Sequence, residues 1–244
     1  MILLDCGNHQ IKAQQWRGRG SSETCSHKYD DGWEAALSGW LHQQDASQCF
    51  YASVLDADRQ RRLAQVLKQV FGSDVTRLFT QAEALGVVNG YAQPQQLGVD
   101  RWLALLAAAE LVDSDCMVID AGSAITVDLL RADGRHLGGA ILPGCSTSQA
   151  DFKRIFRHID FTDPAIDEIE APGISTVTAI QLDFARSSME ILVDLVERWV
   201  DWFDASPTLL LTGGDAHTVQ RALSQPTRIV PDLVFLGMRR MADA

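Results

Sequence analysis

The feature that most constrains this chain is a repeated pattern: a hydrophobic strand ends in an aspartate, a glycine-containing turn follows, and a second strand leaves the turn. It occurs as LLDCGNHQIKA at residues 3–13 and again as VIDAGSAITVD at residues 118–128. Asp5 and Asp120 stand 115 positions apart in a chain of 244 residues. A repeat at about half the chain length predicts two structurally similar units, each of ordinary domain size.

Both halves continue with hairpin strands followed by alternating helices and strands. In the first half, residues 17–31 are polar and are predicted to be irregular, and DADRQ opens a helix with acids, as the helix dipole favours. The elements expected in this half are strands at 1–6, 11–16, 48–54 and 75–79, and helices at 33–43, 56–71 and 100–112.

The second half is predicted to begin with three strands in a meander, because RADG at residues 131–134 is a strong hairpin signal. A buried strand, a double-glycine turn and a helix follow in TLLLTGGDAHTVQRAL. The remaining expected elements are helices at 144–157, 176–203 and 231–242, with a loop at 161–173. The order predicts two similar α/β units, each with a mixed sheet flanked by helices.

Composition excludes several classes of function. A net charge of −11 makes the chain a poor candidate for binding nucleic acid. Without a long apolar run or a signal-peptide pattern, we expect neither membrane insertion nor secretion. Five scattered cysteines without a CxxC spacing argue against a disulfide framework or a zinc site, and favour the cytoplasm.

The acid–glycine turns fit the chemistry of phosphate binding. Backbone N–H groups approach a phosphate chain closely where no Cβ intervenes, and an aspartate at the strand end can hold a cation that bridges phosphates. Asp5 with Gly7, and Asp120 with Gly122, both suit this role, and the TGGDA turn would let a ring or ribose lie against the backbone. For either Asp-x-Gly turn alone, ordinary hairpin chemistry is the better explanation, and the TGGDA turn alone is nonspecific, since many α/β loops have such a sequence.

The order DCGN, GVDR, DAGSAIT, GGAILPG, TGGDA resembles the type III pantothenate kinases, of the acetate kinase, sugar kinase, Hsp70 and actin superfamily. The resemblance runs from residue 3 to the final helix. It implies two ribonuclease H-like (actin-like ATPase) domains with a cleft between them, at residues 1–113 and 114–231, with the helix at 232–244 packing on the first. It also implies ATP-dependent phosphorylation of pantothenate in coenzyme A biosynthesis.

The resemblance implies that GVDR and the loop before it bind the acceptor. Asp100 would be the general base and Arg101 would pair with the substrate carboxylate, while Tyr91, Gly98 and Val99 would contact substrate. From the residues alone, Asp100 is equally a helix N-cap, Arg101 a surface cation and Tyr91 a rim aromatic. Arg101 nevertheless opposes the helix dipole by about 0.3–1 kcal/mol, which favours a functional role.

The resemblance also assigns the nucleotide site, with Mg²⁺ accompanying ATP and a monovalent cation (K⁺ or NH₄⁺) held by Asp120. Gly138, Gly139, Pro143 and Gly144 are expected to shape a loop that closes the cleft. Lys12 is, on the residues alone, also explained as an edge lysine. The residues implied to bind ATP are Asp5, Cys6, Gly7, Asn8, His9, Gln10, Ile11, Lys12, Ser123, Gly213 and Gly214.

The family forms homodimers, in which Thr176 would reach the partner's pantothenate site; on the residues alone, Ser175 or Thr176 is equally the N-cap of the long helix. His9 departs from the family pattern, which has a hydroxyl residue there, and this weakens the expected phosphate contact. Two other functions stay open. One is a kinase for another small hydroxyl substrate, such as a sugar or acetate, and the other is a non-catalytic accessory or regulatory protein on the same fold.

Overall fold

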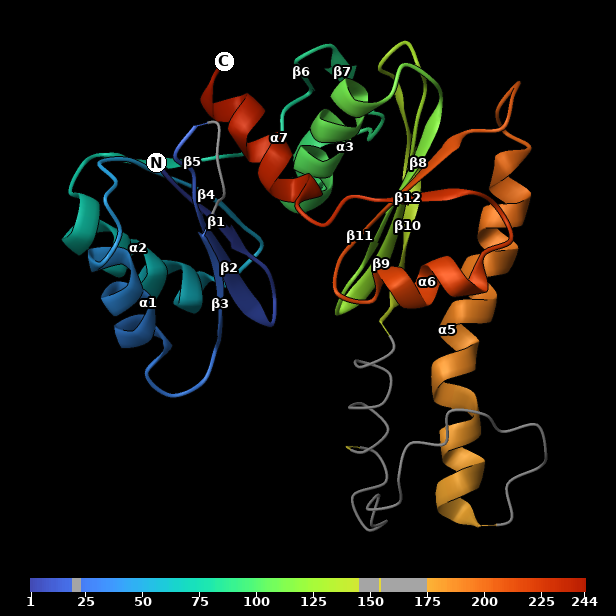
Figure 1. The fold of residues 1–244 in the computed structure, drawn as a ribbon, viewed down its shortest axis with the longest axis horizontal. Coiled ribbons are helices and arrows are strands. Elements are labelled where there is room, and N and C mark those ends of the chain that lie inside the picture. The colour runs from blue at the N-terminus through green and yellow to red at the C-terminus, as the bar shows by residue number, and fades with distance from the viewer. Residues whose placement is uncertain (19–22, 145–153, 155–174) are drawn as a thin grey trace. The chain divides into compact units, whose positions relative to one another are not determined.

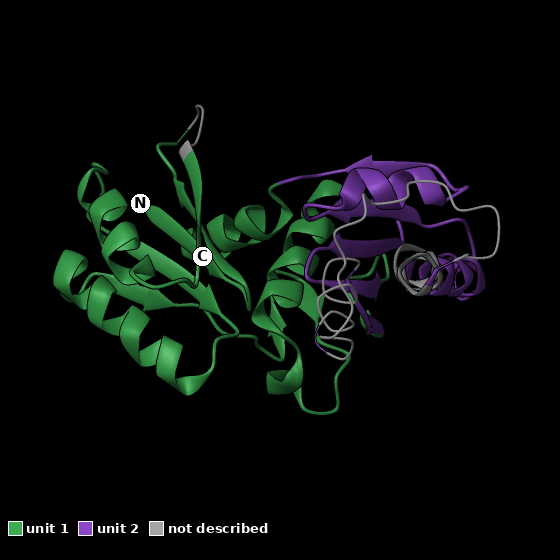
Figure 2. Ribbon diagram, turned by 90° about the horizontal axis from the view of Figure 1, so that it is seen from below, with its two compact units in different colours: residues 1–113, 130–138, 232–244 green, residues 114–129, 139–231 purple. Residues whose placement is uncertain are grey.

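The computed structural model describes residues 1–18, 23–144, 154 and 175–244. These residues form two compact units. The first comprises residues 1–113, 130–138 and 232–244, and the second residues 114–129 and 139–231 (Figure 2). The segment 130–138 therefore packs with the first unit, whereas the sequence-based ranges included it in the second.

The first unit contains a mixed five-stranded sheet. Strand β1 pairs antiparallel with β2, and β2 with β3, while β4 and β5 run parallel to β1. The order across the sheet is β3-β2-β1-β4-β5, with bounds Glu23–Lys28, Gln10–Gln15, Ile2–Cys6, Cys49–Ser53 and Val75–Arg77.

The second unit repeats this arrangement. Its order is β10-β9-β8-β11-β12, and β11 runs parallel to both β8 and β12. Counted from the start of each unit, the strand order is the same in both sheets, which confirms the prediction of two similar mixed sheets. The bounds of these strands are His136–Pro143, Ala124–Leu130, Cys116–Ala121, Thr208–Thr212 and Thr227–Ile229.

Helices α1 (Trp33–His42) and α2 (Ala57–Phe71) cover one face of the first sheet (Figure 1). The Asp56 carboxylate caps α2 by accepting hydrogen bonds from the N–H groups of Asp58 and Arg59. The core between these helices and the sheet includes Ile2, Leu4, Cys6, Ile11, Trp33, Leu37, Leu63 and Leu67. Since side chains alternate along a strand, Leu3 and Asp5 lie on the opposite face of β1.

Helices α3 (Val99–Leu111) and α7 (Leu233–Ala242) pack against each other and against strands β1 and β4. Nearly every residue of α3 from Val99 to Ala108 is buried, which explains why LALLAAA is apolar on all sides. The two helices approach very closely, because a Cβ placed on Gly237 would lie 1.9 Å from the Leu103 carbonyl oxygen. Glycine is therefore required at this crossing.

In the second unit, α6 (Ala216–Ala222) packs on β8, β11 and β12, and on α5 (Thr176–Val200). Figure 1 shows α6 beside the sheet, with α5 as the longest helix drawn. Of the helix predicted at 144–157, residues 145–153 and 155–157 lie outside the described part of the chain, as does the loop predicted at 161–173.

One segment predicted to be irregular is a strand, one expected loop lies largely in a strand, and one hairpin was not predicted. The polar stretch at 17–31 contains strand β3, in which residues 24–28 alternate between exposed and half-buried positions, as an edge strand does. Strand β10 confirms the third strand of the predicted meander, and it includes Gly138, Gly139 and Pro143, which were also expected to shape a loop. A short hairpin, β6 (Glu83–Ala84) and β7 (Val87–Val88), was not predicted, because its turn places the non-glycine Leu85 at φ 52°.

That hairpin explains why residues 130–138 pack with the first unit. The Val88 N–H donates to the Gly134 carbonyl at 2.9 Å, and Val88 also forms a parallel bridge with Arg135. A Cβ on Gly134 would lie 1.9 Å from the Gly86 carbonyl oxygen, so the two turns are in backbone contact.

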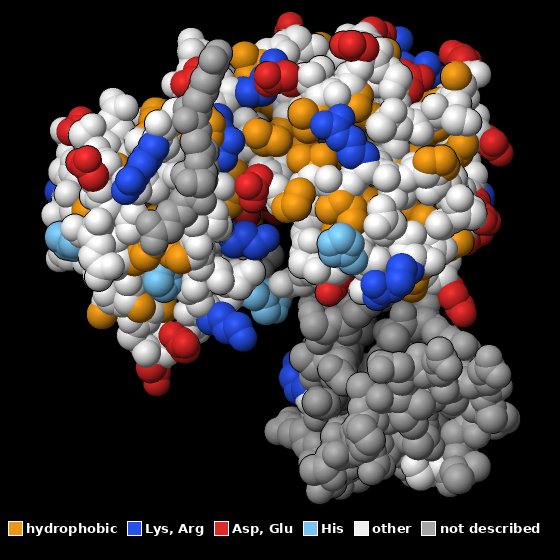
Figure 3. Space-filling model, in the orientation of Figure 1, with side chains coloured by type: hydrophobic (Ala, Val, Ile, Leu, Met, Phe, Trp, Pro, Cys, Tyr) orange, Lys and Arg blue, Asp and Glu red, His pale blue; other side chains and the backbone are white. Residues whose placement is uncertain are grey.

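None of the helices in the described ranges is both long enough and apolar enough to cross a membrane. On the face drawn in Figure 3, basic and acidic side chains of the described residues are interspersed. This mixture is typical of a solvated protein surface.

Candidate functional site

The first turn of α3 positions Asp100. The N-cap of this helix is Gly98 and has no side-chain cap, so the alternative in which Asp100 itself caps the helix was wrong. Instead, Asp100 Oδ1 accepts a hydrogen bond from the Arg101 N–H at 2.9 Å. A Cβ on Gly98 would lie 2.5 Å from this same oxygen. The glycine therefore leaves room for the carboxylate.

Arg101 is a buried cation, with 6% of its surface exposed. Its Nη1 donates to the Tyr91 hydroxyl at 2.9 Å, and its guanidinium carbon lies 5.6 Å from the centroid of the Tyr91 ring. The surface-arginine alternative was therefore wrong. Burying a charge is costly unless it is compensated, and a guanidinium held this way is suited to pairing with an anion.

The loop that carries Tyr91 is fixed by Asn89, which sequence reasoning missed. Asn89 is buried, and its side-chain amide donates to the carbonyls of Gln81 and Pro94, each at 3.2 Å. Its Oδ1 accepts from the Tyr91 N–H at 3.0 Å. The only sequence signal was the Asn-Gly pair, which marks a turn but not these partners.

The predicted acceptor residues of GVDR and its loop thus come together in the first unit. Tyr91, Asp100 and Arg101 supply a hydroxyl, a carboxylate and a guanidinium. Val99 is 8% exposed, so its side chain belongs to the core and only its backbone is available.

The first acid–glycine turn joins β1 to β2. Asp5 lies directly opposite Lys12 in the antiparallel register, and the Gly7 N–H donates to the Gln10 carbonyl at 3.1 Å. A Cβ on Gly7 would make only an ordinary contact of 3.5 Å, so packing within the turn does not require glycine. Asn8 and His9 are exposed at the tip.

Two other predicted residues of this turn, Cys6 and Ile11, are buried in the core. Burial raises the pKa of the Cys6 thiol well above its usual range, and the neighbouring Asp5 carboxylate raises it further. Cys6 is therefore a neutral core residue, and only its backbone can face a ligand.

Arg59, another residue that the sequence analysis missed, reaches this turn from the start of α2. Its Nη1 donates to the Asn8 carbonyl at 3.2 Å, and its guanidinium carbon lies 4.8 Å from the Tyr29 ring centroid. The sequence placed Arg59 in a helix but gave no sign of this long-range contact.

The second unit brings its own predicted residues together around Asp120. A Cβ on Gly213, which has φ +90°, would lie 2.3 Å from the Ala121 carbonyl oxygen and 2.5 Å from Asp120 Oδ1. The Asp215 N–H donates to the Ala121 carbonyl at 2.9 Å. The TGGDA turn is thus packed directly against the second acid–glycine turn.

Gly144 packs on the same turn from the end of β10. Its N–H donates to the Ser123 carbonyl at 3.1 Å, and a Cβ there would lie 2.3 Å from the Gly122 carbonyl oxygen. Ser123 is exposed, whereas a Cβ on Gly214 would meet nothing within 4 Å. Ser123 and Gly214 therefore border open space beside Asp120.

In the described ranges, no three His, Cys, Asp or Glu side chains gather as a metal-binding group. The donors near the turns are instead single carboxylates with backbone carbonyls, a set that suits hard cations held largely by a ligand's own oxygens. Thr176 is the first residue of α5, and its side chain lies outside the described part of the structure.

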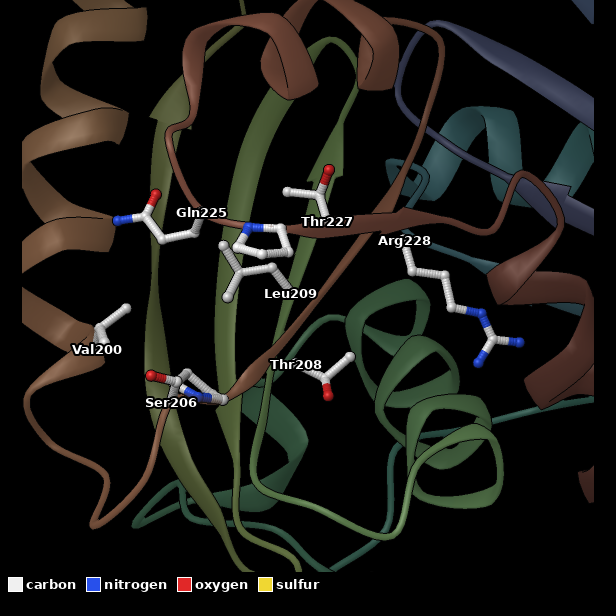
Figure 4. Close-up of a pocket in the computed structure, with 9 residues that line it drawn as sticks. Val200, Ser206, Thr208, Leu209, Gln225, Thr227 and Arg228 are labelled. Carbon is white, nitrogen blue, oxygen red and sulfur yellow. The ribbon is translucent and has the colours of Figure 1, made fainter.

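A cavity of about 410 Å³ in the second unit contains none of the predicted site residues. It lies at the start of strands β11 and β12, beside the end of α5 (Figure 4), whereas Gly213 follows the other end of β11. Its lining residues are Val200, Ser206, Pro207, Thr208, Leu209, Gln225, Pro226, Thr227 and Arg228.

Comparison with solved structures identifies the fold. A structure described as a Baf family transcriptional activator from Campylobacter jejuni matches with a TM-score of 0.57 at 23% identity, covering 100% of this chain and 98% of that one. Acetate kinase from Porphyromonas gingivalis matches with a TM-score of 0.52 at 9% identity, covering 99% and 98%. These similarities confirm the predicted actin-like ATPase fold.

Comparison of sequences identifies the family. The model for type III pantothenate kinases matches residues 1–198. The type III pantothenate kinase of Pseudomonas putida is 38% identical, covering 98% of this chain and 97% of the relative. That of Azotobacter vinelandii is 33% identical, covering 98% and 96%. The chain therefore belongs to the type III pantothenate kinase family.

Proposed function

We propose that the protein phosphorylates pantothenate with ATP, giving 4′-phosphopantothenate in the first step of coenzyme A biosynthesis. The observation that carries this proposal is the grouping of Asp100, Arg101 and Tyr91 at the start of α3. Pantothenate presents a primary hydroxyl to be phosphorylated and a carboxylate to be recognised. The group offers one chemical partner for each.

Asp100 acts as the general base in this proposal. Its carboxylate accepts the hydroxyl proton as the substrate oxygen bonds to the γ-phosphorus of ATP, and the bond from that phosphorus to the β,γ-bridging oxygen breaks to release ADP. Because phosphoryl transfer depends mainly on positioning, the space that Gly98 provides for Asp100 Oδ1 is central to the mechanism.

Arg101 and Tyr91 bind the carboxylate end of pantothenate. A buried guanidinium attracts an anion strongly and can form a charge-assisted hydrogen bond, while its contact with Tyr91 restricts its rotation. The backbone of Gly98 and Val99 contributes further contacts.

In this proposal, residues of each acid–glycine turn contribute to ATP binding. Gly7 and Gly214 support this assignment, because neither is required by the packing of its own turn and each leaves the backbone open to a ligand. Residues 5–12 would receive the phosphates with Lys12 supplying charge, and Ser123, Gly213 and Gly214 would contact the rest of the nucleotide. A divalent cation, which we take to be Mg²⁺, would neutralise charge on the phosphates.

Three further features belong to the proposal. Asp120 would ligate a monovalent cation, K⁺ or NH₄⁺, since its single carboxylate lies among backbone carbonyls. The enzyme would act in the cytoplasm, in keeping with Cys6, Cys25, Cys49 and Cys116, which form no disulfides with one another. It would be a homodimer in which Thr176 reaches the partner's pantothenate site.

The test is ATP-dependent phosphorylation of pantothenate, measured with K⁺, with NH₄⁺ and with neither. We expect turnover that depends on the monovalent cation. A sugar and acetate serve as competing acceptors, and preference for either would contradict the substrate assignment. Binding of ATP without turnover on any acceptor would instead indicate an accessory protein and overturn the proposal.

A further inference from the structure

His136, at the start of β10, is a buried imidazole that the roles proposed above do not use. It is 3% exposed and lies in segment 130–138, which packs with the first unit. Its neighbours are residues of the loop that carries Tyr91. A polar ring buried beside a substrate loop needs a structural or functional reason.

Two adjacent residues of the loop contact this histidine. The Gly90 N–H donates to His136 Nδ1 at 3.3 Å. The Tyr91 ring stacks on the imidazole, with centroids 5.8 Å apart and planes inclined by 16°. Because Nδ1 accepts a hydrogen bond, the imidazole carries its proton on Nε2 when it is neutral.

The backbone of the loop is equally close to β10. A Cβ on Gly90 would lie 2.0 Å from the His136 carbonyl oxygen, so only glycine permits this approach. The main chain of His136 thus contacts Gly90, and its side chain contacts both Gly90 and Tyr91. The loop backbone next to Tyr91 is therefore in direct contact with the start of β10.

Tyr91 is consequently restrained at three points. Asn89 Oδ1 binds its backbone N–H, His136 supports one face of its ring, and Arg101 Nη1 donates to its hydroxyl. Tyr91 therefore links His136 to the guanidinium of Arg101, which is proposed to bind the substrate carboxylate. Removing the support would free both Tyr91 and Arg101 to adopt other rotamers.

We propose that His136 is a positioning residue for pantothenate, acting through Tyr91 to orient Arg101. This inference rests on the proposed function. A preorganised guanidinium loses less side-chain entropy when substrate binds. His136 thus contributes to affinity for the carboxylate end of the substrate, while the transfer step depends on Asp100.

Two substitutions separate the contributions of the imidazole. His136→Asn keeps an acceptor near the place of Nδ1 but removes the stacked ring, whereas His136→Phe keeps a ring and removes the acceptor. We expect each to raise KM for pantothenate on the order of 3- to 10-fold, with kcat and KM for ATP within about twofold. His42→Asn, on an exposed histidine of α1, is the matched control and should change none of these constants.

The decisive measurement is a double-mutant cycle with Tyr91. In a Tyr91→Ala background, His136→Phe should no longer raise KM for pantothenate, because the residue through which it acts is gone. Thermal melting of each variant reports whether the fold is retained. An equal effect of His136→Phe in both backgrounds, or a rise in KM for ATP, would show a general structural role and overturn the inference.

Failure of the inference is distinguishable from failure of the proposed function. If the wild type turns over pantothenate and Arg101→Ala raises its KM while both His136 variants match the wild type, only the inference fails. If the wild type shows no turnover, calorimetric binding of pantothenate to the same variants replaces the kinetics. Absence of binding to the wild type would overturn both.

Discussion

Asp100 Oδ1 occupies the space that a side chain at position 98 would fill. A Cβ on Gly98 would lie only 2.5 Å from it, and the same oxygen accepts the Arg101 N–H. The position of the Asp100 carboxylate thus depends on the absence of a side chain at Gly98 and on the hydrogen bond from the Arg101 N–H. This relationship allows the role of the carboxylate to be tested separately from its position.

Asp100→Asn should reduce kcat by about 10²- to 10⁴-fold, the usual contribution of a general base. Asparagine keeps an Oδ1 that can accept the Arg101 N–H, so the fold and KM for pantothenate should be preserved. Steady-state kinetics and a thermal melt measure both. An unchanged rate would show that another group accepts the hydroxyl proton.

Gly98→Ala should reduce kcat by displacing Asp100. The φ of Gly98, −54°, is accessible to alanine, so any effect comes from the new methyl group and not from backbone strain. A loss on the order of 10-fold is expected for such a misplacement. In an Asp100→Ala background the same change should have no further effect on the residual rate, and an undiminished loss there would disprove the mechanism.

Arg101→Lys should raise KM for pantothenate about 10- to 100-fold, because lysine cannot reproduce the forked, charge-assisted bond. The alcohol analogue, in which the carboxylate is replaced by a hydroxymethyl group, supplies the control. The KM for this analogue should already be high with the wild type and should change little in the variant. Equal loss with both acceptors would place Arg101 away from the carboxylate.

The adjacent glycines of the TGGDA turn should behave differently. Gly213→Ala should destabilise the protein by about 1–3 kcal/mol, because φ is +90° and the methyl group would clash with Ala121 and Asp120. Gly214→Ala should leave stability within about 0.5 kcal/mol and raise KM for ATP. Denaturant unfolding and ATP kinetics of the matched pair test this. Identical behaviour of the two variants would contradict the proposal that the backbone at Gly214 faces ATP.

Stability should fall in alkali partly because of buried thiols. Burial raises the pKa of Cys49 to about 12, and burial with a contribution from Asp115 raises that of Cys116 to about 12. In the unfolded chain these thiols ionise with a pKa of about 8.5. Their contribution to the free energy of unfolding is therefore fully present below that pH and is lost as the pH rises toward about 12.

The expected loss is up to about 1.4 kcal/mol per pH unit for each thiol. Urea unfolding between pH 9 and 11 measures the slope for the wild type and for Cys116→Ala. The variant should have the shallower slope by up to that amount. Equal slopes would indicate that Cys116 is not held neutral in the folded protein.

The sequence predicted most reliably where local chemistry repeats. The Asp5 and Asp120 turns located the first two strands of each sheet, and the helices predicted at 56–71 and 100–112 correspond to α2 and α3. Strand β3 was missed because its polar residues lie at a half-exposed sheet edge. Leu85 was missed because a non-glycine residue at φ 52° has no local signal.

At the candidate site, too, the sequence predicted residues within a local motif but not residues that act through long-range contacts. GVDR identified Asp100 and Arg101, but Asn89, Arg59 and His136 act through contacts with residues distant in sequence or through backbone partners. No spacing rule reveals such contacts. In HLGGAIL the histidine occupies a buried strand position, and this polar residue at an inward position was the only clue.

Helix α7 packs on α3, which carries Asp100 and Arg101, with Gly237 against Leu103. A variant that lacks residues 233–244 would hold both side chains on a helix whose apolar flank faces water. Such a chain should be inert and a target for chaperones or proteases. Helix α7 would then support activity from outside the candidate site, by keeping α3 in its packed position.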